Sequence, residues 1–312
     1  GDLDGTVGGG WNNTARGGWA TVGGGWNNTA SGHYAVVAGG YGNIAANFYA
    51  IVVGGERNAA TTNYATVGGG ELNYATDENT TVGGGYYNTA SGRFATVGGG
   101  LLNHASGRGA TIPGGRLNTA TNYAFAAGHR AKADHQGAFV WADSTDADIA
   151  STTNNSVTFR AAGGYRLFSD TWAAAGVSIA PGGTSWAVIS DRNVKKDFAP
   201  VDGLEVLEKL AALPMTQWRY AWETAETTPH IGPMAQDFKA AFYPGADDKV
   251  ITTQEADGVA LAAIQGLNTK LESGKQKAEM RMEKLEAENA ALKARLERLE
   301  QLLAQQLNQN TP

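Results

Sequence analysis

The chain has 312 residues, with 24 basic and 30 acidic side chains and a net charge of −6. It contains no cysteine, which excludes a disulfide framework and a thiolate metal site. The acidic balance, without a basic patch in the repetitive N-terminal part, argues against nucleic acid as a partner, and no run approaches about 18 apolar residues, so no membrane span is expected. The chain opens at Gly1 in mid-repeat, so we expect a fragment, in which a missing signal peptide carries no information on export.

A repeat of fifteen residues occupies the chain up to about residue 128. Its core is Ala-Thr-Val-Gly-Gly-Gly or a close variant, and the period has no insertion over eight copies. A valine column keeps this step as Val7, Val22, Val37, Val52, Val67, Val82, Val97 and Ile112. An asparagine column keeps it as Asn13, Asn28, Asn43, Asn58, Asn73, Asn88, Asn103 and Asn118. A repeat this regular predicts a solenoid.

Each repeat is predicted to form one coil of parallel β structure with two short strands and glycine corners. The unit is too short for a pair of helices, and it has glycines where a helix would need side chains. Alternation along the strand places Ala20 and Val22 inside and Thr21 outside. The asparagine column then predicts an amide ladder that ties each coil to the next.

A lumen of valine and alanine is thin and buries far less apolar area per residue than a globular core. One such rod is therefore not expected to be stable alone. An aromatic column at one place in the coil suits packing between neighbouring rods, and it consists of Trp19, Tyr34, Tyr49, Tyr64 and Phe94. These features predict a homotrimer.

A second aromatic column follows the glycine corner and leaves two interpretations open. Its members are Trp11, Trp26, Tyr41 and Tyr86. Exposed rings at these positions could stack on the sugars of a receptor, or they could pack against an adjacent chain.

Residues 129–189 are predicted to form a β-rich neck, because short strand-like pieces alternate with turn residues. The strands are expected at 138–141, 157–160, 165–168 and 176–179. His129 and His135 have only Asp134 as a nearby carboxylate, so no metal site is predicted. No cofactor is predicted either.

The composition changes at Ser190, where a charged segment runs to residue 197. An amphipathic helix is expected at 203–213, stopped by Pro214. An alternating strand at 217–222 and a turn and strand at 230–236 should follow, and another helix should begin near Val259.

Heptads follow that helix and predict a left-handed coiled coil, in which Gly274 is expected to be an interruption and Asn289 fixes the register. The pattern alone does not distinguish two strands from three. Its seam is Ile264, Asn268, Leu271, Ala278, Met282, Leu285, Asn289, Leu292, Leu296, Leu299 and Leu303.

Two parts of the chain resemble known families. Residues 5–130 resemble the left-handed β-roll heads of trimeric autotransporter adhesins and of related phage and bacterial fibre proteins. Residues 190–271 resemble the intramolecular chaperone of endosialidase-type phage tailspikes and other tail fibres, which helps the trimer form and then cuts itself off. The second resemblance is carried by Ser190-Asp191-Arg192 with Lys195, by residues 230–237 and by the helix at 258–265.

The resemblance implies a mainly β, trimeric extracellular fibre, on a phage virion or a bacterial cell surface. Its expected parts are a β-roll head at 1–128, the neck at 129–189, a small α+β chaperone and autoprotease domain at 190–272 and a coiled-coil tail at 273–312. It also makes Ser190 the nucleophile and Lys195 the base of a self-cleaving dyad. Weaker candidates for orienting groups are Asp191, Arg192 and His230.

The chemistry of such a dyad needs a neutral lysine, whose amine takes the Ser190 hydroxyl proton so that the alkoxide attacks the carbonyl of Ile189. Arg192 and Lys196, together with burial between chains, would favour the neutral amine. Cleavage between Ile189 and Ser190 would release residues 190–312. On spacing alone, the same segment could be a solvated charged turn, and His230 could be a structural histidine.

Three hypotheses stay open at this point. The chain is a self-processing structural or adhesive fibre, a protease that acts on other proteins, or a receptor- or glycan-binding fibre without processing. The first predicts two products from purified protein, cut before Ser190. The second predicts cleavage of an inactive copy supplied in trans, and the third predicts a specific receptor.

Overall fold

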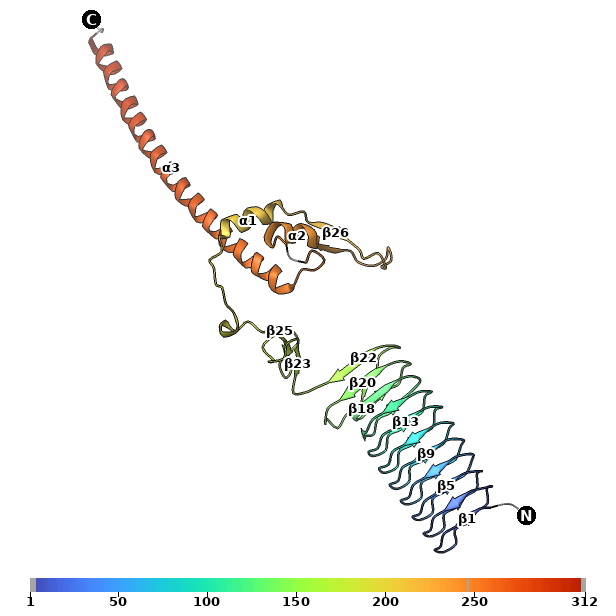
Figure 1. The fold of residues 1–312 in the computed structure, drawn as a ribbon. Coiled ribbons are helices and arrows are strands. Elements are labelled where there is room, and N and C mark those ends of the chain that lie inside the picture. Colours follow the sequence, from blue (N-terminus) through green and yellow to red (C-terminus); the bar gives the residue numbers. More distant parts are fainter. Residues whose placement is uncertain (1–3, 246, 310–312) are drawn as a thin grey trace. The chain divides into compact units, whose positions relative to one another are not determined.

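The computed structural model describes residues 4–245 and 247–309, with side chains up to residue 306 in the C-terminal helix (Figure 1). The chain divides into two compact units, Gly1–Ala187 and Val188–Pro312. The first unit is built from β-strands, and the second contains the helices.

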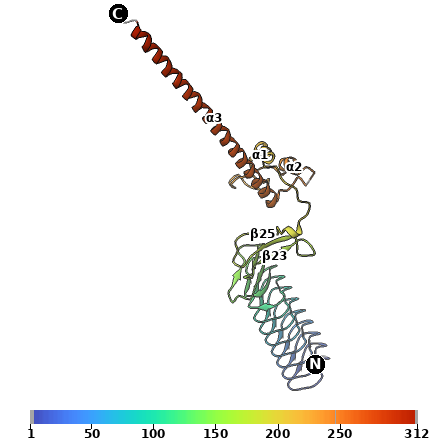
Figure 2. The same ribbon diagram turned by 90° about the vertical axis from the view of Figure 1, so that its left-hand side faces the viewer.

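Two parallel sheets run along the first unit, because each coil contributes one strand to each sheet (Figures 1 and 2). The first sheet contains β1 (Thr6–Val7), β3 (Thr21–Val22), β5 (Val36–Val37), β7 (Ile51–Val52), β9 (Thr66–Val67), β11 (Thr81–Val82), β13 (Thr96–Val97), β15 (Thr111–Ile112), β16 (Gly115–Arg116), β18 (Phe125–His129), β20 (Phe139–Ala142) and β22 (Val157–Arg160). The second contains β2 (Thr14–Ala15), β4 (Thr29–Ala30), β6 (Ile44–Ala45), β8 (Ala59–Ala60), β10 (Tyr74–Ala75), β12 (Thr89–Ala90), β14 (His104–Ala105), β17 (Thr119–Ala120), β19 (Ala131–Ala133) and β21 (Ile149–Ala150). Val7 pairs with Val22 and Thr14 with Thr29, so the predicted solenoid of fifteen-residue coils is confirmed.

The lumen of the solenoid is lined by valine and alanine, as the alternation predicts. Ala20 and Val22 are completely buried, whereas Thr21 between them is half-buried. Each fully buried valine side chain contributes about 1.5–3 kcal/mol through the hydrophobic effect. The buried valine column comprises Val22, Val37, Val52, Val67, Val82 and Val97, and Ile112 continues it.

The predicted asparagine ladder runs through the solenoid and satisfies the glycine corners. Asn73 is fully buried, and its Nδ2 donates to the carbonyl oxygens of Gly69 at 2.9 Å and Gly85 at 2.8 Å. Its Oδ1 accepts from the backbone N–H of Asn88 at 3.0 Å. The side chain therefore joins its own coil to the next one, and the same pattern recurs along the column.

Replacing Asn73 by Ala is expected to lower the free energy of unfolding by more than about 2 kcal/mol, because several buried backbone groups lose their partners. Chemical denaturation followed by circular dichroism measures this change. Asn63→Ala is the matched control, since Asn63 is half-exposed on the outside of the coil, and its effect should stay below about 0.5 kcal/mol. Equal effects of the two substitutions would contradict the ladder as a source of stability.

The solenoid continues beyond residue 128, although the step of fifteen residues already ends where Thr111 pairs with Phe125. Phe125 pairs with Phe139 and Phe139 with Val157, so the register steps become 14 and 18 residues instead of 15. The predicted strand at 138–141 is β20, shifted by one residue, and the one at 157–160 is β22. Beyond it, β23 (Tyr165–Phe168) and β24 (Gly176–Ile179) form an antiparallel pair at the predicted positions, with β25 (Ala187–Val188) next to β24.

The second unit contains α1 (Gly203–Ala212), a hairpin of β26 (Thr216–Trp218) and β27 (His230–Gly232), α2 (Ala235–Phe242) and α3 (Thr253–Gln309). The Asp202 carboxylate caps α1 by accepting from the N–H groups of Leu204 and Glu205. α1 crosses α3 closely, because a side chain at Gly266 would overlap the carbonyl of Gly203. The small core of the second unit consists of Leu213, Phe238 and Val259.

Four predictions for this unit need correction. The strand expected within 230–236 ends at Gly232, and Ala235 already begins α2. The strand expected at 217–222 ends at Trp218, because the N–H of Tyr220 bonds to the Glu223 carboxylate in a turn instead of to a neighbouring strand. The last helix begins at Thr253 and not near Val259. It continues through Gly274, since a glycine in a helix interior costs only about 1 kcal/mol.

The seam of the predicted coiled coil lies exposed along α3 in the single chain. The heptad leucines Leu285, Leu292, Leu296, Leu299 and Leu303 are each about half or more exposed. A helix with such a stripe lacks the surface that normally buries it. Within the described residues, no helix has the length and apolar character to cross a membrane.

Candidate active site

A short helical turn follows Ser190 and organises the charged segment. The 3-10 helix η1 (Arg192–Val194) is capped by Asp191, whose Oδ1 accepts from the backbone N–H of Asn193 at 2.9 Å and from its Nδ2 at 3.0 Å. The backbone N–H of Lys195 donates to the Arg192 carbonyl at 3.2 Å and closes the turn. Asp and Asn favour such local side-chain bonds to the backbone.

The turn brings the two residues of the predicted dyad together. Lys195 Nζ donates to Ser190 Oγ at 2.6 Å. An ammonium group has three donors and no acceptor, so this contact holds the hydroxyl but does not yet activate it. If the same amine is neutral, its lone pair lies within reach of the hydroxyl proton, as the nucleophilic chemistry requires.

The surroundings of the dyad are open in the single chain. Residues 190–202 are all exposed, and apart from η1 the backbone between Ser190 and α1 has no regular secondary structure. The apolar side chains of Phe198 and Val201 are 69% and 68% exposed, which is a high fraction for their type.

The remaining predicted site residues are divided between two places. Asp191 and Arg192 lie in the turn with Ser190 and Lys195, Asp191 as its cap. His230 lies in β27, where its Nε2 is 3.1 Å from Glu223 Oε1. In the described part of the chain, no hydrogen bond or ion pair joins His230 to Ser190 or Lys195.

His230 belongs to an aromatic cluster on the hairpin. Its ring lies 4.6 Å from Trp218 and 5.5 Å from Tyr220, between centroids. The hydrogen bond with His230 is the main cause that lowers the pKa of the Glu223 carboxyl, and the N–H of Tyr220 adds to it. Glu223 thus ties the hairpin turn to β27, an interaction that the sequence analysis did not foresee.

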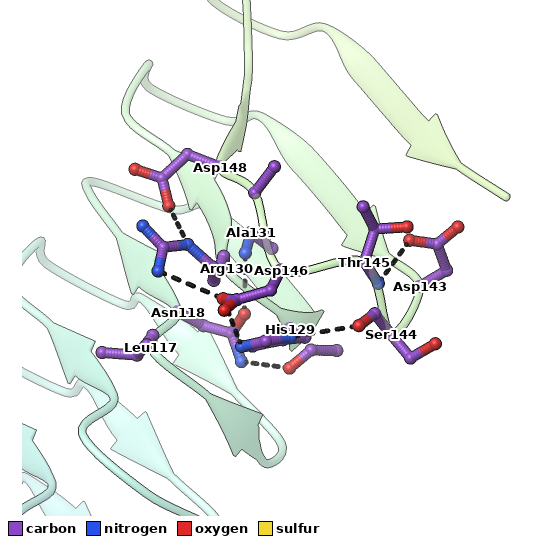
Figure 3. Close-up of polar contacts among 12 residues, drawn as sticks. Leu117, Asn118, His129, Arg130, Ala131, Asp143, Ser144, Thr145, Asp146 and Asp148 are labelled. Carbon is purple, nitrogen blue, oxygen red and sulfur yellow. Dashed lines mark hydrogen bonds and ion pairs between the residues drawn. The ribbon is translucent and has the colours of Figure 1, made fainter. Parts of the chain in front are cut away.

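A second polar network lies at the end of the solenoid (Figure 3). Arg130 donates to Asp148 at 2.7 Å and to Asp146 at 3.3 Å, which holds the loop of residues 143–148 against β19. His129 Nδ1 lies 3.3 Å from the Ser144 carbonyl, and His135 Nδ1 lies 2.8 Å from Ser151 Oγ. The two histidines therefore have separate polar partners, and among the described residues no cluster has the composition of a metal site.

Asp143 anchors this network. Its carboxylate accepts from the N–H groups of Ala162 at 2.7 Å and Thr145 at 3.1 Å and from Arg160 Nε at 2.9 Å. The Ala162 bond is the largest of the causes that hold the pKa of the Asp143 carboxyl well below its usual range. A carboxyl whose pKa is lower in the folded than in the unfolded chain stabilises the folded state at pH values above its unfolded pKa. This stabilisation is lost as the pH falls through the folded pKa.

The Asp143→Asn variant is therefore expected to be less stable than wild type at pH 7, and the difference should shrink below about pH 4. Melting temperatures measured across the acid range test this. Asp134→Asn, at an exposed carboxylate of the same unit, serves as the control. A constant difference between wild type and Asp143→Asn at all pH values would refute the assignment.

Comparison with known proteins identifies one family in the second unit. Residues 190–247 match the family model described as chaperone of endosialidase, and the match begins at Ser190 itself. No curated protein matches the chain. The predicted combination of a parallel β-solenoid with a chaperone-of-endosialidase domain is thus confirmed.

Neither α2 nor the ion pair that anchors it was predicted from the sequence. Lys239 is 5% exposed, and its Nζ donates to Glu255 Oε1 at 2.6 Å, which contributes most to the lowered pKa of Glu255. Glu255 also accepts from the N–H of Thr252 at 3.0 Å, and its own N–H donates to Thr252 Oγ1 at 3.2 Å. This is a capping box, and the pattern Thr-x-x-Glu at 252–255 was the available signal for the start of α3.

Proposed function

We propose that this chain forms a trimeric extracellular fibre whose C-terminal domain aligns three copies and then cuts itself off between Ile189 and Ser190. The observation that carries the proposal is the contact of Lys195 Nζ with Ser190 Oγ at 2.6 Å, at the first residue of the chaperone match. A phage tail fibre or a bacterial surface fibre is the setting that fits such a domain.

The cleavage proceeds through an ester. The neutral Lys195 amine takes the hydroxyl proton of Ser190, and Oγ attacks the carbonyl carbon of Ile189. The bond from that carbon to the Ser190 nitrogen breaks, the nitrogen takes a proton, and an ester joins Ile189 to Ser190 Oγ. Water then hydrolyses the ester, which leaves a carboxylate at Ile189 and restores the Ser190 hydroxyl with a free amino group.

Self-association is supported by surfaces that the single chain leaves exposed. The heptad leucines of α3 form one of them, and the column of stacked rings from Trp19 to Tyr64 forms another. The open dyad fits the same view, because burial between chains would remove water from Lys195 and favour its neutral amine. Cleavage would then follow assembly.

The repeat itself explains why an alignment domain is useful. Neighbouring coils are nearly identical, so a shift of one chain by fifteen residues against its partners costs little within the solenoid. A domain that associates at one end fixes the register before the long stack forms, and this avoids trapped, misaligned states. Once the domain is removed, the trimer is kinetically stable, because the aligning piece is gone.

Mass spectrometry and light scattering of the purified full chain test the proposal. The expected result is a trimer whose denatured mass corresponds to residues 1–189, accompanied by a fragment that begins at Ser190. A folded monomer would contradict the proposed trimer, and a trimer of intact chains would contradict the proposed cleavage. An inactive copy supplied in trans should stay intact, since the dyad lies next to its own peptide bond.

A further inference from the structure

The outside of the solenoid carries two aromatic columns with different geometry. The ladder column consists of Trp19, Tyr34, Tyr49 and Tyr64, all with positive φ. The corner column directly follows the glycine corners and is joined from coil to coil by single β-bridges. It consists of Trp11, Trp26, Tyr41, Glu56 and Glu71 in the first coils, and Tyr86, Leu101 and Arg116 continue it.

Successive rings of the ladder column stack on one another and cover the faces between them. Trp19 and Tyr34 stack at 5.0 Å with planes 9° apart, and Tyr49 and Tyr64 stack at 5.3 Å and 5°. Between them, Tyr34 and Tyr49 stack at 4.9 Å and 3°. Since the faces between successive rings are covered, this column suits apolar packing against sister chains better than stacking on a sugar.

The corner column differs in both stacking and charge. Trp11 is 73% and Trp26 57% exposed, and the ring of Tyr41 is tilted by 51° from that of Trp26, so these faces are not closed by parallel stacking. Glu56 and Glu71 are bridge partners in adjacent coils, and Arg57 lies 3.5 Å from Glu56. Burial of two neighbouring carboxylates with a single cation between chains would be costly, so the corner column belongs to the solvent side of an assembled fibre.

The backbone beside the rings forms an open floor. A side chain at Gly24, two residues before Trp26, would meet no atom within 4 Å. At Gly54, two residues before Glu56, the nearest atom would be the Gly39 carbonyl oxygen at 4.0 Å. A flat ligand can therefore lie along the corners with its face on the rings.

We propose that the corner column, from Trp11 to Glu71, binds a neutral saccharide chain lying along the solenoid. The electron-rich faces of Trp11 and Trp26 fit the C–H face of a sugar ring, whereas the guanidinium of Arg57 lies over the ring of Tyr41, 5.4 Å from its centroid. Glu56 and Glu71 accept hydrogen bonds from sugar hydroxyls, and the same two charges repel carboxylated or phosphorylated sugars. This binding function is independent of the proposed self-cleavage.

Binding of neutral and carboxylated oligosaccharides to the purified full chain tests the site. We expect neutral hexose and N-acetylhexosamine oligomers to bind, and carboxylated ones to bind at least about tenfold more weakly. The double variant Trp11→Ala/Trp26→Ala should lose affinity for the neutral oligomers about tenfold or more, because two ring faces are removed. Trp172→Ala is the matched control, since Trp172 is 87% exposed outside the column, and its affinity should equal that of wild type.

A charge variant separates the two parts of the site. Glu56→Gln/Glu71→Gln should reduce the difference in affinity between neutral and carboxylated oligomers to less than about threefold, because the amides accept hydrogen bonds without repelling a carboxylate. If the double variant does not fold, the same binding measurement is made on the single variant Trp11→Ala. The inference is overturned if no neutral oligomer binds wild type, if both tryptophan variants bind like wild type, or if Trp11 and Trp26 are shielded from a fluorescence quencher in the assembled protein, which would make the column an interface between copies.

Discussion

Substitution of Ser190 by Ala is expected to yield a single intact chain from a preparation in which wild type yields two fragments. The variant keeps the turn, because the Asp191 cap and the Arg192 carbonyl do not involve the serine side chain. It lacks only the nucleophile, and this loss should lower the rate of cleavage at least about a thousandfold. Denaturing electrophoresis with intact mass determination measures the outcome.

The lysine provides the second half of this test with a control next to it in the chain. Lys195→Met should be equally intact, because no other amine contacts Ser190 Oγ among the described residues. Lys196→Met removes the same charge one position later and should still be cleaved. Cleavage of Ser190→Ala at the same bond, or equal loss of cleavage in both lysine variants, would refute the dyad.

Assembly of these variants distinguishes failure of cleavage from failure of folding. Intact Ser190→Ala and Lys195→Met should still be trimers by light scattering, because the heptad seam of α3 and the outer columns are unchanged. An intact monomer would instead indicate that the substitution disturbed the chaperone domain.

The sequence predicted the solenoid well because one physical repeat determines both pattern and structure. Each inward valine and each ladder asparagine contacts the same residue of the next coil, so the columns Val22, Val37 and Asn28, Asn43 already contain the register. From Thr111 onward the register steps of the first sheet change to 14 and then 18 residues, and the strands keep pairing although the column pattern is lost. The sequence period therefore shows where the fifteen-residue repeat ends, but it does not show where the solenoid ends.

In the second unit, too, some contacts could be predicted from the sequence and others could not. The contact of Ser190 with Lys195 follows from a spacing of five residues and a turn, both of which are local. The partner of His230 is Glu223, on the other side of a hairpin turn, and that of Lys239 is Glu255, in another helix. Such pairs depend on tertiary packing, and no local pattern in the sequence indicates them.

Alanine at Gly55 is expected to destabilise the solenoid severely, whereas alanine at the neighbouring Gly54 is not. Gly55 has φ of +87°, a conformation that side chains rarely adopt, and its new methyl group would overlap the carbonyl oxygen of Gly70. That oxygen accepts from the N–H of Glu56 at 2.8 Å and from Asn58 Nδ2 at 2.8 Å. It cannot move without breaking both bonds, so the free energy of unfolding should fall by more than about 3 kcal/mol.

Gly54 is the matched control because it lies in the same corner with open space around its Cα. The nearest atom to a methyl group there would be the Gly39 carbonyl oxygen at 4.0 Å, which is ordinary contact. Gly54→Ala should change the free energy of unfolding by less than about 1 kcal/mol, and loss of glycine freedom in the unfolded chain favours a small gain. Thermal unfolding of both variants measures the contrast, and similar melting temperatures would contradict the close approach of successive corners. Because the same approach recurs at Gly25, Gly40, Gly70 and Gly85, a glycine there is required by the stacking distance itself and not by any single coil.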